Sequence, residues 1–582
     1  MKIIEKKYPN GISENDVLKL IDAGKNPWVS NSLALRGVKD PTESMWKYQL
    51  VNFFELKGMK DLVENLIVAI QKKEKIVIVA DYDCDGATAC AIGMLGLKGL
   101  GANIDFIVPN RFKHGYGLTP SVIEDLMYKE PKWILTVDNG IASHEGVEYA
   151  NKKGIKVLVT DHHLPAKDKE NPPAVAIVNP NQAGDESGLN NMAGCGVIFY
   201  TVCALRSEMI KRGIITKEEA INIVELLDIV ALGTVADVVI LDKNNRWLVK
   251  KGLDRIRAGV ANPGINALFE IAGKDIRFAS SIDFGFALGP RLNAAGRLED
   301  MTIGIRCLMS SDYEEAKNLG LQLNELNQKR KEIENEMKDY AQHFMDETIP
   351  ENAMTRVIFG EDFHEGVIGI VAGRIKEKND VPTIVFAPAE HKNELGEDIE
   401  PKLIKGSGRS VPGLHLRDAI DVVYKKYPKI FKGFGGHAMA AGVTILKDEL
   451  ELFSREFESA VNQIMNGKKF QKSLEVDAIL PVSAMTIETT RELEKEVWGQ
   501  GFNDPIWYGM FTVESASLMG VGEQHLRLSV SKDGKVFNAV HFFNNKQPKV
   551  GDKIGIAYKL NVNVFRNVEN LQLMIVDKEE DV

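Results

Sequence analysis

Cysteine is scarce in this sequence, with five residues in 582 and no two of them in a CxxC pair. The scarcity excludes a disulfide framework and the paired thiolates of a structural zinc site, so we expect free thiols in a reducing cytoplasm. Basic residues are also relatively few: the sequence has 72 lysines and arginines and 82 acidic residues, and the net charge is −10. A protein that coats DNA regardless of sequence is usually basic, which disfavours that class but not an enzyme with local phosphate contacts.

The sequence also lacks a long apolar run of the kind that crosses a membrane. The most apolar long stretch, residues 221–241, contains Glu225, Asp228 and Asp237. Residues 1–10 are charged and have no apolar core, so we expect no signal peptide. A hydrophobic content of 44% is ordinary for a globular protein, and 582 residues are too many for one domain. We therefore expect a cytoplasmic protein of several domains with no membrane partner.

The stretch IVIVADYDCDG, residues 76–86, is the centre of the functional prediction. Its continuous apolar run, residues 76–80, predicts a strand buried on both faces. Asp81, Asp83 and Asp85 follow, and alternation along an extended chain would point their carboxylates the same way. Three like charges repel one another, and a divalent cation is the usual compensation. The alternative, an acidic turn that caps the next helix, accounts for one or two aspartates better than for three.

Strand and helix patterns alternate from residue 76 to about residue 239, which is typical of a parallel sheet covered by helices on both faces. The predicted strands are residues 76–80, 104–108, 133–137, 157–160 and 175–178. In such sheets ligands bind beyond the carboxyl ends of the strands. There the sequence places Asp138 in VDNG and Asp161-His162-His163 in TDHH, and Asp237 ends the helical run ALGTVAD. Their convergence on one edge predicts a metal site, although each motif alone is weak.

The ligand types predict the chemistry. Carboxylates with one or two imidazoles and no thiolate suit Mn²⁺ or Mg²⁺ better than structural zinc. Four or more acids can hold two ions about 4 Å apart, an arrangement that activates water and stabilises charge on a phosphoryl centre. We therefore expect hydrolysis of a phosphate ester or anhydride.

The four motifs DYDCDG, VDNG, TDHH and GTVAD resemble those of the DHH phosphoesterase superfamily. The resemblance implies catalytic roles near the metals or the scissile phosphate for Asp81 and His163. The metal ligands that it implies are Asp83, Asp85, Asp138, His162 and Asp237. The pyrophosphatase branch has a histidine four residues before the position of Asp83; Val79 stands there, which argues against a pyrophosphatase.

A second motif narrows the resemblance. Residues 289–298, GPRLNAAGRL, and the later helical stretch with Leu323-Asn324, Leu326-Asn327 and Arg330 look like the RecJ group of single-strand-specific 5′→3′ DNA exonucleases. Arg291, which we assign to the catalytic set, and Arg297 can bind phosphates, and Asn293 can donate to one. The alternative is a helix-rich surface with ordinary arginines.

Three glycine-rich motifs mark a further domain, with strands predicted at residues 355–359, 383–386 and 403–405. HEGVIGIVAGRI predicts a helix start that exposes backbone amides to an anion, and GFGGHAMAAG is interpreted as a second such start. With GSGRS they resemble the nucleic-acid-binding DHHA1 domain. The nucleic-acid ligands so implied are Ser407, Arg409, Gly435, Gly436 and His437. Such turns alone usually mean only tight turns, and the polar stretch 390–400 is interpreted as a surface insertion.

The C-terminal region shows alternating apolar residues over 511–515, 525–530, 536–543 and 553–562, which predicts a small β-barrel of the OB type. Candidate stacking or phosphate-binding groups are Phe502, Arg527, Phe542 and Arg566. The alternative is that the aromatic side chains belong to the barrel core. Residues 311–344 predict one long charged helix, and its length and the polar stretch 328–338 indicate that it connects two domains. A coiled coil is the alternative, but no heptad is sustained.

The predicted fold class is α/β: a parallel-sheet DHH domain and an α/β DHHA1-like domain joined by a long helix, followed by a C-terminal OB-fold β-barrel. The predicted boundaries are an N-terminal helical extension over 1–75, the DHH domain over 76–310, the connecting helix over 311–347, the DHHA1-like domain over 348–466 and the OB-fold domain over 470–582.

The predicted function is a metal-dependent exonuclease of single-stranded DNA that acts in DNA repair and recombination, with a 5′→3′ direction implied only by the resemblance. Single-stranded DNA is the expected partner, the candidate protein partners are a single-strand-binding protein and a helicase, and we expect a monomer. One alternative is a DHH-type phosphodiesterase of short oligonucleotides or cyclic dinucleotides, which has no need of the barrel. The other is a catalytically inactive DNA-binding factor, which the complete ligand set disfavours.

Overall fold

The computed structural model describes residues 2–44, 47–110, 114–166, 169–389, 402–470, 473–565 and 568–578. The predicted insertion at residues 390–400 and the candidate Arg566 lie outside these ranges. The chain divides into two compact units. The first consists of Met1–Asn293, Asp300–Gln322 and Ser473–Val582, and the second of Ala294–Glu299 and Leu323–Lys472.

The N-terminal segment of the first unit is only partly helical. Its elements are β1 (Lys2–Glu5), α1 (Glu14–Asp22), α2 (Pro27–Ala34), α3 (Pro41–Ser44), a 3₁₀ turn (Phe53–Glu55) and α4 (Met59–Gln71). Strand β1 was not predicted, because its partner β12 (Ser473–Val476) lies more than 400 residues away in the chain. The extension was predicted to be helical, but residues 47–52 form no helix. Asn52 there caps the short turn by accepting from Phe54 N.

The central sheet has five parallel strands in the order β3-β2-β4-β5-β6. They are β2 (Lys75–Ala80), β3 (Asn103–Ile107), β4 (Trp133–Val137), β5 (Lys156–Thr160) and β6 (Ala176–Val178), which confirms the predicted strands. From β2 the chain moves to one side for β3 and then crosses to the other side for β4. The carboxyl ends of β2 and β4 therefore form the switch point where such folds bind ligands.

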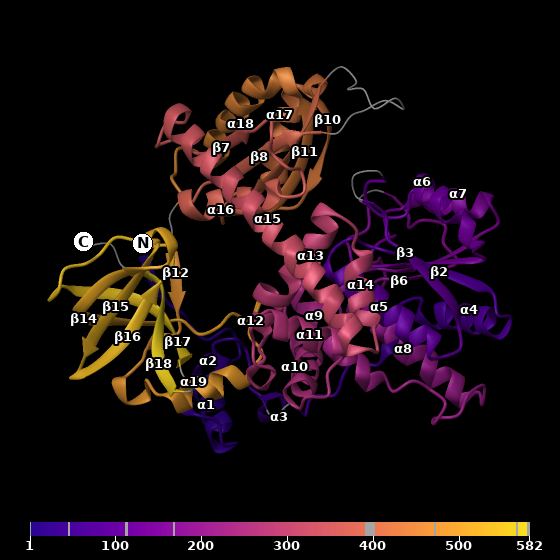
Figure 1. Cartoon of the computed structure of the whole chain (residues 1–582), viewed down its shortest axis with the longest axis horizontal. Coiled ribbons are helices and arrows are strands. Elements are labelled where there is room, and N and C mark those ends of the chain that lie inside the picture. Colours follow the sequence, from indigo (N-terminus) through magenta and orange to yellow (C-terminus); the bar gives the residue numbers. More distant parts are fainter. Residues whose placement is uncertain are drawn as a thin grey trace. The chain divides into compact units, whose positions relative to one another are not determined.

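Helices pack on both faces of this sheet, and an all-helical region follows it in the chain (Figure 1). They are α5 (Cys84–Lys98), α6 (Pro120–Leu126), α7 (His144–Lys152), α8 (Gly194–Lys211), α9 (Leu227–Ala236), α10 (Lys243–Arg257), α11 (Pro263–Ile271), α12 (Ser281–Asp283), α13 (Gly289–Leu298) and α14 (Thr302–Met309). A short π-helix, Phe284–Leu288, joins α12 to α13. All residues of β2 from Ile76 to Ala80 are buried, so solvent can reach this central strand at its carboxyl end and not at its faces.

Helix α15 (Tyr313–Thr348) begins in the first unit and ends in the second, as predicted for one long helix. The second unit has the sheet order β10-β11-β9-β8-β7. Its strands are β7 (Arg356–Phe359), β8 (Thr383–Pro388), β9 (Leu403–Arg409), β10 (Phe431–Gly436) and β11 (Ala440–Leu446), and its helices are α16 (Ile368–Asn379), α17 (Leu416–Lys426) and α18 (Leu450–Met465).

The helix start predicted within GFGGHAMAAG was wrong. Residues 431–436 form strand β10, and His437 N donates to Ala440 O at 2.8 Å in the turn that leads to β11. Phe431 and Phe434 direct their rings onto Tyr424 of α17, which fixes this glycine-rich stretch as a sheet edge. The helix start predicted near Gly366 is confirmed by α16.

The C-terminal part of the first unit is a closed barrel in the order β14-β15-β16-β18-β17, and β14 also pairs with β17. Its elements are β13 (Ala478–Ile479), α19 (Ile487–Lys495), β14 (Trp507–Met519), β15 (His525–Lys532), β16 (Lys535–His541), β17 (Lys553–Phe565) and β18 (Val568–Lys578). Trp507, Phe511 and Tyr558 fill its core. The four predicted strands are confirmed, and β18 was missed.

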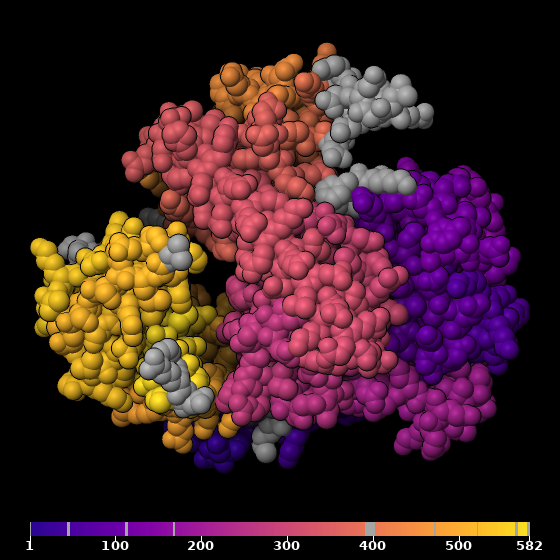
Figure 2. Space-filling view, viewed as in Figure 1, coloured from indigo at the N-terminus to yellow at the C-terminus, as the bar shows by residue number. Residues whose placement is uncertain are grey.

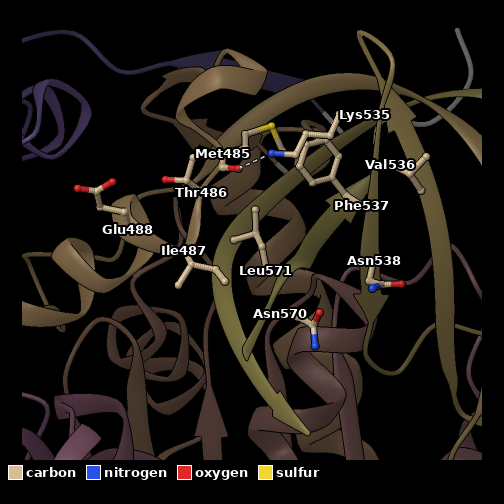
Figure 3. A pocket seen from close by; sticks show the side chains of 10 residues that line it. All are labelled: Met485, Thr486, Ile487, Glu488, Lys535, Val536, Phe537, Asn538, Asn570 and Leu571. Carbon is tan, nitrogen blue, oxygen red and sulfur yellow. Dashed lines mark hydrogen bonds between the residues drawn. The ribbon is translucent and has the colours of Figure 1, made fainter. Parts of the chain in front are cut away.

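Strands β16 and β18 pair only over Asn538–Val540, and a groove opens where they separate. Its volume is about 540 Å³, and Phe537 and Leu571 lie on its wall beside the start of α19 (Figure 3). The candidate Phe502 is not placed to stack on nucleic acid. Its ring is buried against Trp498, with the Arg246 guanidinium 3.9 Å from its centroid.

In the part of the chain that the structure describes, no helix combines the length and the apolar character that a membrane span requires. All five cysteine side chains are buried and free.

Candidate metal centre

The aspartates of DYDCDG lie where β2 ends and α5 begins. Asp81 and Asp85 are buried. Asp83 is the N-cap of α5, and its side chain accepts from Gly86 N at 3.0 Å. A carboxylate at this position complements the exposed amides of the helix start. For this one aspartate, the alternative of an acidic turn that caps the helix therefore holds. The cap uses one oxygen of Asp83 and leaves its other oxygen, and the carboxylates of Asp81 and Asp85, for another role.

The N-terminus of α8 holds the Asp85 carboxylate. Gly194 N and Cys195 N donate to its two oxygens at 2.6 and 3.0 Å. Gly194 also lies against Asp138, and a Cβ at this position would collide with that carboxylate. The start of α8 is therefore part of the site, which the sequence prediction missed because a glycine in AGCG carries no chemical signal of its own.

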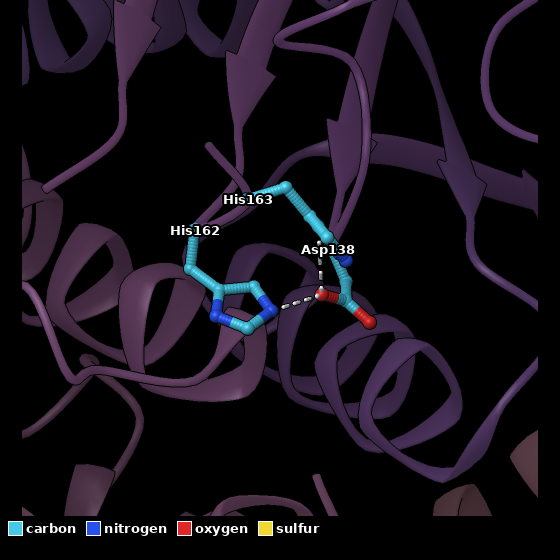
Figure 4. A group of neighbouring side chains, drawn as sticks. All are labelled: Asp138, His162 and His163. Atoms are coloured by element: carbon cyan, nitrogen blue, oxygen red, sulfur yellow. Dashed lines mark ion pairs between the residues drawn. The ribbon is translucent and has the colours of Figure 1, made fainter. Parts of the chain in front are cut away.

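Asp138 and His162 meet at the switch point (Figure 4). Asp138 follows β4 with φ +61°, a left-handed conformation that is uncommon for a residue other than glycine and is often found at functional sites. Its Oδ1 lies 3.1 Å from His162 Nε2. The same imidazole nitrogen is 3.5 Å from Asp237 Oδ2 and 3.9 Å from Asp85 Oδ2. Four predicted ligands therefore share one small space.

Three overlapping groups of ligand atoms can be drawn among the described residues, with the atoms of each group within 4.8 Å of one another. They are Asp138 with His162 and His163, Asp85 with His162 and Asp237, and Asp81 with Asp83 and Asp138. Asp138 belongs to two of these groups. That position is what a carboxylate shared by two cations requires.

The donor atoms at the centre fit a metal ion. Asp138 Oδ1 and His162 Nε2 are buried and make no hydrogen bond within the described structure. A buried polar atom without a partner costs free energy, so such atoms are rare unless an ion or water satisfies them. Carboxylate oxygens with one neutral imidazole are ligands of Mn²⁺ and Mg²⁺.

The electrostatics of the cluster agree with this interpretation. Burial, reinforced by the neighbouring carboxylates, raises the pKa of Asp81, Asp83, Asp138 and Asp237 above the usual aspartate value. Burial lowers the pKa of His162 and so favours the neutral imidazole that binds metals. Without a cation the cluster thus opposes its own ionisation.

Asp161 positions the two histidines. The sequence prediction placed it in the TDHH motif but gave it no role. Burial opposes ionisation of Asp161, but hydrogen bonds outweigh it and its pKa is lowered. Its Oδ1 accepts from His162 N at 2.7 Å and from His163 N at 3.1 Å, and lies 2.8 Å from His163 Nδ1. Although burial disfavours the charged imidazole, the contact with Asp161 raises the pKa of His163 to about 9. Tyr116, which the prediction missed, lies with its hydroxyl 3.2 Å from His163 Nε2.

Helix α13 carries the three residues predicted within GPRLNAAGRL. Asn293 Oδ1 accepts from Cys84 N at 2.8 Å, so Asn293 contacts the DYDCDG loop itself through its carbonyl oxygen. Arg291 Nη1 donates to Ala287 O at 2.6 Å. Arg297 belongs to the second unit, where Nη1 donates to Gly366 O at 2.9 Å.

The predicted nucleic-acid ligands of the second unit form two sets. Arg409 Nη1 donates to Ser407 Oγ at 3.2 Å, and both side chains lie against Gly369 in the first turn of α16. Gly435, Gly436 and His437 are exposed at the β10–β11 turn. The contacts unite Ser407 and Arg409 at a helix start, as expected for an anion site. They do not assign a ligand to the turn.

Three family models match the chain: the DHH family N-terminal domain over residues 75–234, the DHHA1 domain over 351–463 and the RecJ OB domain over 476–577. The chain is 40% identical over 565 residues to the single-stranded-DNA-specific exonuclease RecJ of Escherichia coli, covering 94% of this chain and 95% of the relative. It is 41% identical to the enzyme of that name from Haemophilus influenzae, covering 90% and 91%. The crystal structure of RecJ with Mn²⁺ from Thermus thermophilus matches with a TM-score of 0.80 and 25% identity, covering 100% of this chain and 79% of that one.

Proposed function

The chain belongs to the RecJ family of single-stranded-DNA-specific exonucleases, and from this premise we propose that it removes nucleotides from the 5′ end of a DNA single strand. It is a metal-dependent phosphodiester hydrolase. The observation that carries the proposal is the pair Asp138 Oδ1 and His162 Nε2, buried 3.1 Å apart and without hydrogen bonds at the centre of an acidic cluster.

We assign the metal ligands to this pair and the acidic residues around it. The residues that would hold Mn²⁺ or Mg²⁺ are Asp83, Asp85, Asp138, His162 and Asp237. When bound, two such ions lower the pKa of the attacking water and stabilise negative charge on the phosphate oxygens. The chain contributes rigid placement: α8 amides fix Asp85, and Asp161 fixes the loop that carries both histidines.

His163 supplies positive charge beside the ligands. Its pKa of about 9 keeps the imidazolium protonated at neutral pH, so it can donate a hydrogen bond to a phosphate oxygen or a proton to the leaving oxygen. Asp81 and Arg291 complete the proposed catalytic set. Nearby, Asn293 fixes the ligand loop through Cys84 N.

We assign phosphate binding in the second unit to Arg297, Ser407 and Arg409, with Gly435, Gly436 and His437 at the exposed turn. Arg409 is a guanidinium at a helix start, a combination that suits a phosphate. The barrel would bind the strand through Arg527 and Phe542, which are exposed on it.

The proposed domains keep the predicted boundaries: an N-terminal extension over 1–75, the DHH domain over 76–310, the connecting helix over 311–347, the DHHA1-like domain over 348–466 and the OB-fold domain over 470–582. We further propose that the protein is a cytoplasmic monomer that acts in DNA repair and recombination beside a single-strand-binding protein or a helicase. Neither the dinucleotide phosphodiesterase nor the inactive binding factor is favoured by an observation on this chain.

The test is nucleotide release from single strands labelled at either end, with Mn²⁺ or Mg²⁺, beside duplex, short-oligonucleotide and cyclic-dinucleotide substrates. We expect mononucleotides from the 5′-labelled end of single strands from the start of the reaction. Preferred release from the 3′ end would overturn the direction, and preferred cleavage of dinucleotides would overturn the substrate.

A further inference from the structure

The three family models reported above begin at residue 75, and the sequence assigns no chemistry to the residues before it. The structure shows that residues 2–44, here called the brace, contact the barrel and the segments that lead into it, more than 400 residues away in the chain. Strand β1 pairs in parallel with β12 along its whole length, from Lys2 with Ser473 to Glu5 with Val476. In Figures 1 and 2 the indigo N-terminal region lies beside the gold barrel region.

The central contact of the brace is an ion pair between Arg36 and Asp477. Arg36 Nη1 and Nη2 donate to the two carboxylate oxygens at 2.6 and 3.0 Å, and the side chains are only 4% and 0% exposed. Lys6 Nζ lies 3.6 Å from the same carboxylate. Asp477 joins β12 to β13, and its backbone N donates to Ile506 O at 2.7 Å, at the start of the barrel. The pair therefore fixes the point where the barrel begins.

Further contacts of the brace surround this pair. The guanidinium of Arg36 also lies 5.2 Å from the Trp498 ring centroid, Lys25 pairs with the buried Glu496, and Asn26 N donates to Glu492 at 3.1 Å. Trp28 packs edge-on against Trp507 of the barrel core, with centroids 6.5 Å apart.

The other end of the brace is bonded to the DHH domain. Glu43 of α3 pairs with the buried Arg246 of α10 and with Lys243, whose Nζ lies 3.1 Å from it. The Arg246 guanidinium lies over the Phe502 ring, which belongs to the segment between α19 and β14. That segment also meets the DHH domain directly, since Gln500 O accepts from Leu241 N at 2.8 Å. The brace thus reaches the barrel and the domain that carries the metal ligands.

We propose that the brace sets the position of the barrel relative to the metal centre, and that Arg36 and Asp477 are positioning residues for the degradation of long strands. The proposal rests on the proposed function in one respect, that the barrel binds the strand. A buried ion pair adds little stability over an apolar pair of similar volume, but its fork of hydrogen bonds permits few orientations. A strand held on the barrel then presents its end to the metal centre at a fixed distance.

The test replaces the pair by apolar residues in the full-length protein, Arg36→Met with Asp477→Leu. This double change leaves no buried charge unpaired at the two positions, so the unfolding midpoint should stay close to that of the parent protein. If it does not fold, Arg36→Lys is the second variant, because lysine keeps the charge and loses the two-pronged geometry. Arg212→Gln is the matched control, since Arg212 pairs with Glu64 and Glu208 on the exposed surface.

Two measurements decide the proposal. The first is a distance distribution by fluorescence energy transfer between dyes on Lys152→Cys in α7 and Asn545→Cys after β16, both exposed; the native cysteines are buried and should not react. We expect a narrow distribution in the parent and control proteins and a broad one in the double variant. The second is kcat/KM on a long single strand and on one of a few nucleotides. The long strand should lose about tenfold, the loss of one stacked base, while the short strand is unchanged.

An unchanged distance distribution would overturn the proposal, because the barrel would then be positioned by other contacts. A broadened distribution with undiminished long-strand activity would also overturn it, as would an equal loss on both lengths. If the parent protein degrades neither strand, the proposed function fails, and the energy-transfer experiment still decides whether the brace positions the barrel.

Discussion

Asp138 Oδ1 and His162 Nε2 lie 3.1 Å apart, buried and without hydrogen bonds among the described residues, with Asp85 and Asp237 within 4 Å of the same imidazole nitrogen. Removing the shared carboxylate should therefore abolish the reaction without unfolding the protein. We expect Asp138→Ala to lower nucleotide release by far more than tenfold and to raise the thermal midpoint of the metal-free protein, since one repelling charge is lost. Release from labelled strands and thermal unfolding in chelator measure the two effects. Activity that survives in a folded Asp138→Ala variant would remove Asp138 from the metal centre.

The metal-free protein should become more stable as the pH falls. Burial and mutual repulsion raise the pKa of Asp81, Asp138 and Asp237 in the folded state above the unfolded value of about 3.9. The folded state therefore binds more protons, and stability decreases as the pH rises through the folded pKa values. Their destabilising contribution is complete above those values and disappears towards about pH 4. Denaturant unfolding in chelator across this window tests the slope.

Metal addition provides the complementary measurement. Mn²⁺ should stabilise the protein most at neutral pH and progressively less as protons compete for the carboxylates. The Asp138→Ala variant is the matched control and should respond weakly. A metal-induced shift of equal size in both proteins would indicate binding elsewhere.

Asp161 should act on the reaction through the histidine loop. Asp161→Asn keeps the size of the side chain but has one acceptor oxygen and no charge, so it cannot accept from His162 N and His163 N at one oxygen and from Ile141 N at the other. Partners that orient metal ligands typically contribute about ten- to a hundredfold in activity or metal affinity. We expect kcat to fall within that range and the kcat profile to lose its dependence on a group that titrates near pH 9. An unchanged pH profile would separate Asp161 from the protonation of His163.

Arg409 and His437 test phosphate binding in the second unit. Arg409 also donates to Gly408 O at 2.8 Å, so its guanidinium is preorganised beside Ser407. A charged hydrogen bond to a phosphate is worth roughly 1.5–3 kcal/mol, so Arg409→Ala and His437→Ala should each weaken substrate use by about ten- to a hundredfold. Metal affinity should stay unchanged, and isothermal titration with Mn²⁺ measures it. A parallel loss of metal affinity would indicate a structural role.

The clustering of the proposed metal ligands could be predicted, because local pattern and parallel-sheet topology suffice to bring strand ends together. Asp81 and Asp138 each follow a buried strand, and those strands are neighbours. The roles of Gly194 and Asp161 could not be predicted, because they depend on backbone amides supplied by the fold: Gly194 N reaches a carboxylate 109 residues away. Phe502 was misassigned for a similar reason, since Arg246, distant in sequence, covers its ring.

The glycine-rich GFGG was misassigned because a flexible run is compatible with a helix start and with a strand. Its pairing with β11 and the packing of Phe431 and Phe434 on Tyr424 decide between them. Strand β18 was missed because the start of its sequence, VENLQ, is largely exposed and shows no clear alternation.

The contribution of the barrel to long strands is the last prediction, and the structure changes how it should be tested. Deleting residues 470–582 would spare short substrates if the barrel only holds the strand. Such a deletion would, however, uncover Trp28, leave Arg36 without Asp477 and leave Arg246 without Phe502. Surface substitutions avoid this damage. Phe542 and Phe543 are 42% and 81% exposed beside His525, with ring centroids 5.2 and 5.0 Å from its own, and Arg527 is exposed on β15.

We expect Phe543→Ala and Phe542→Ala to weaken the binding of long single strands by roughly 1–3 kcal/mol per stacked base and to leave the cleavage of very short oligonucleotides intact. Arg527→Ala should weaken long-strand binding uniformly across sequences and reduce the slope of log affinity against log salt by about 0.7, the value for one phosphate contact on a single strand. Val536→Ala, an exposed apolar change on β16, is the matched control. Titrations at several salt concentrations with strands of two lengths measure both effects. A salt slope that stays the same in Arg527→Ala would remove this arginine from the strand path, and equal losses on both lengths in the phenylalanine variants would show that the barrel surface does not hold the strand.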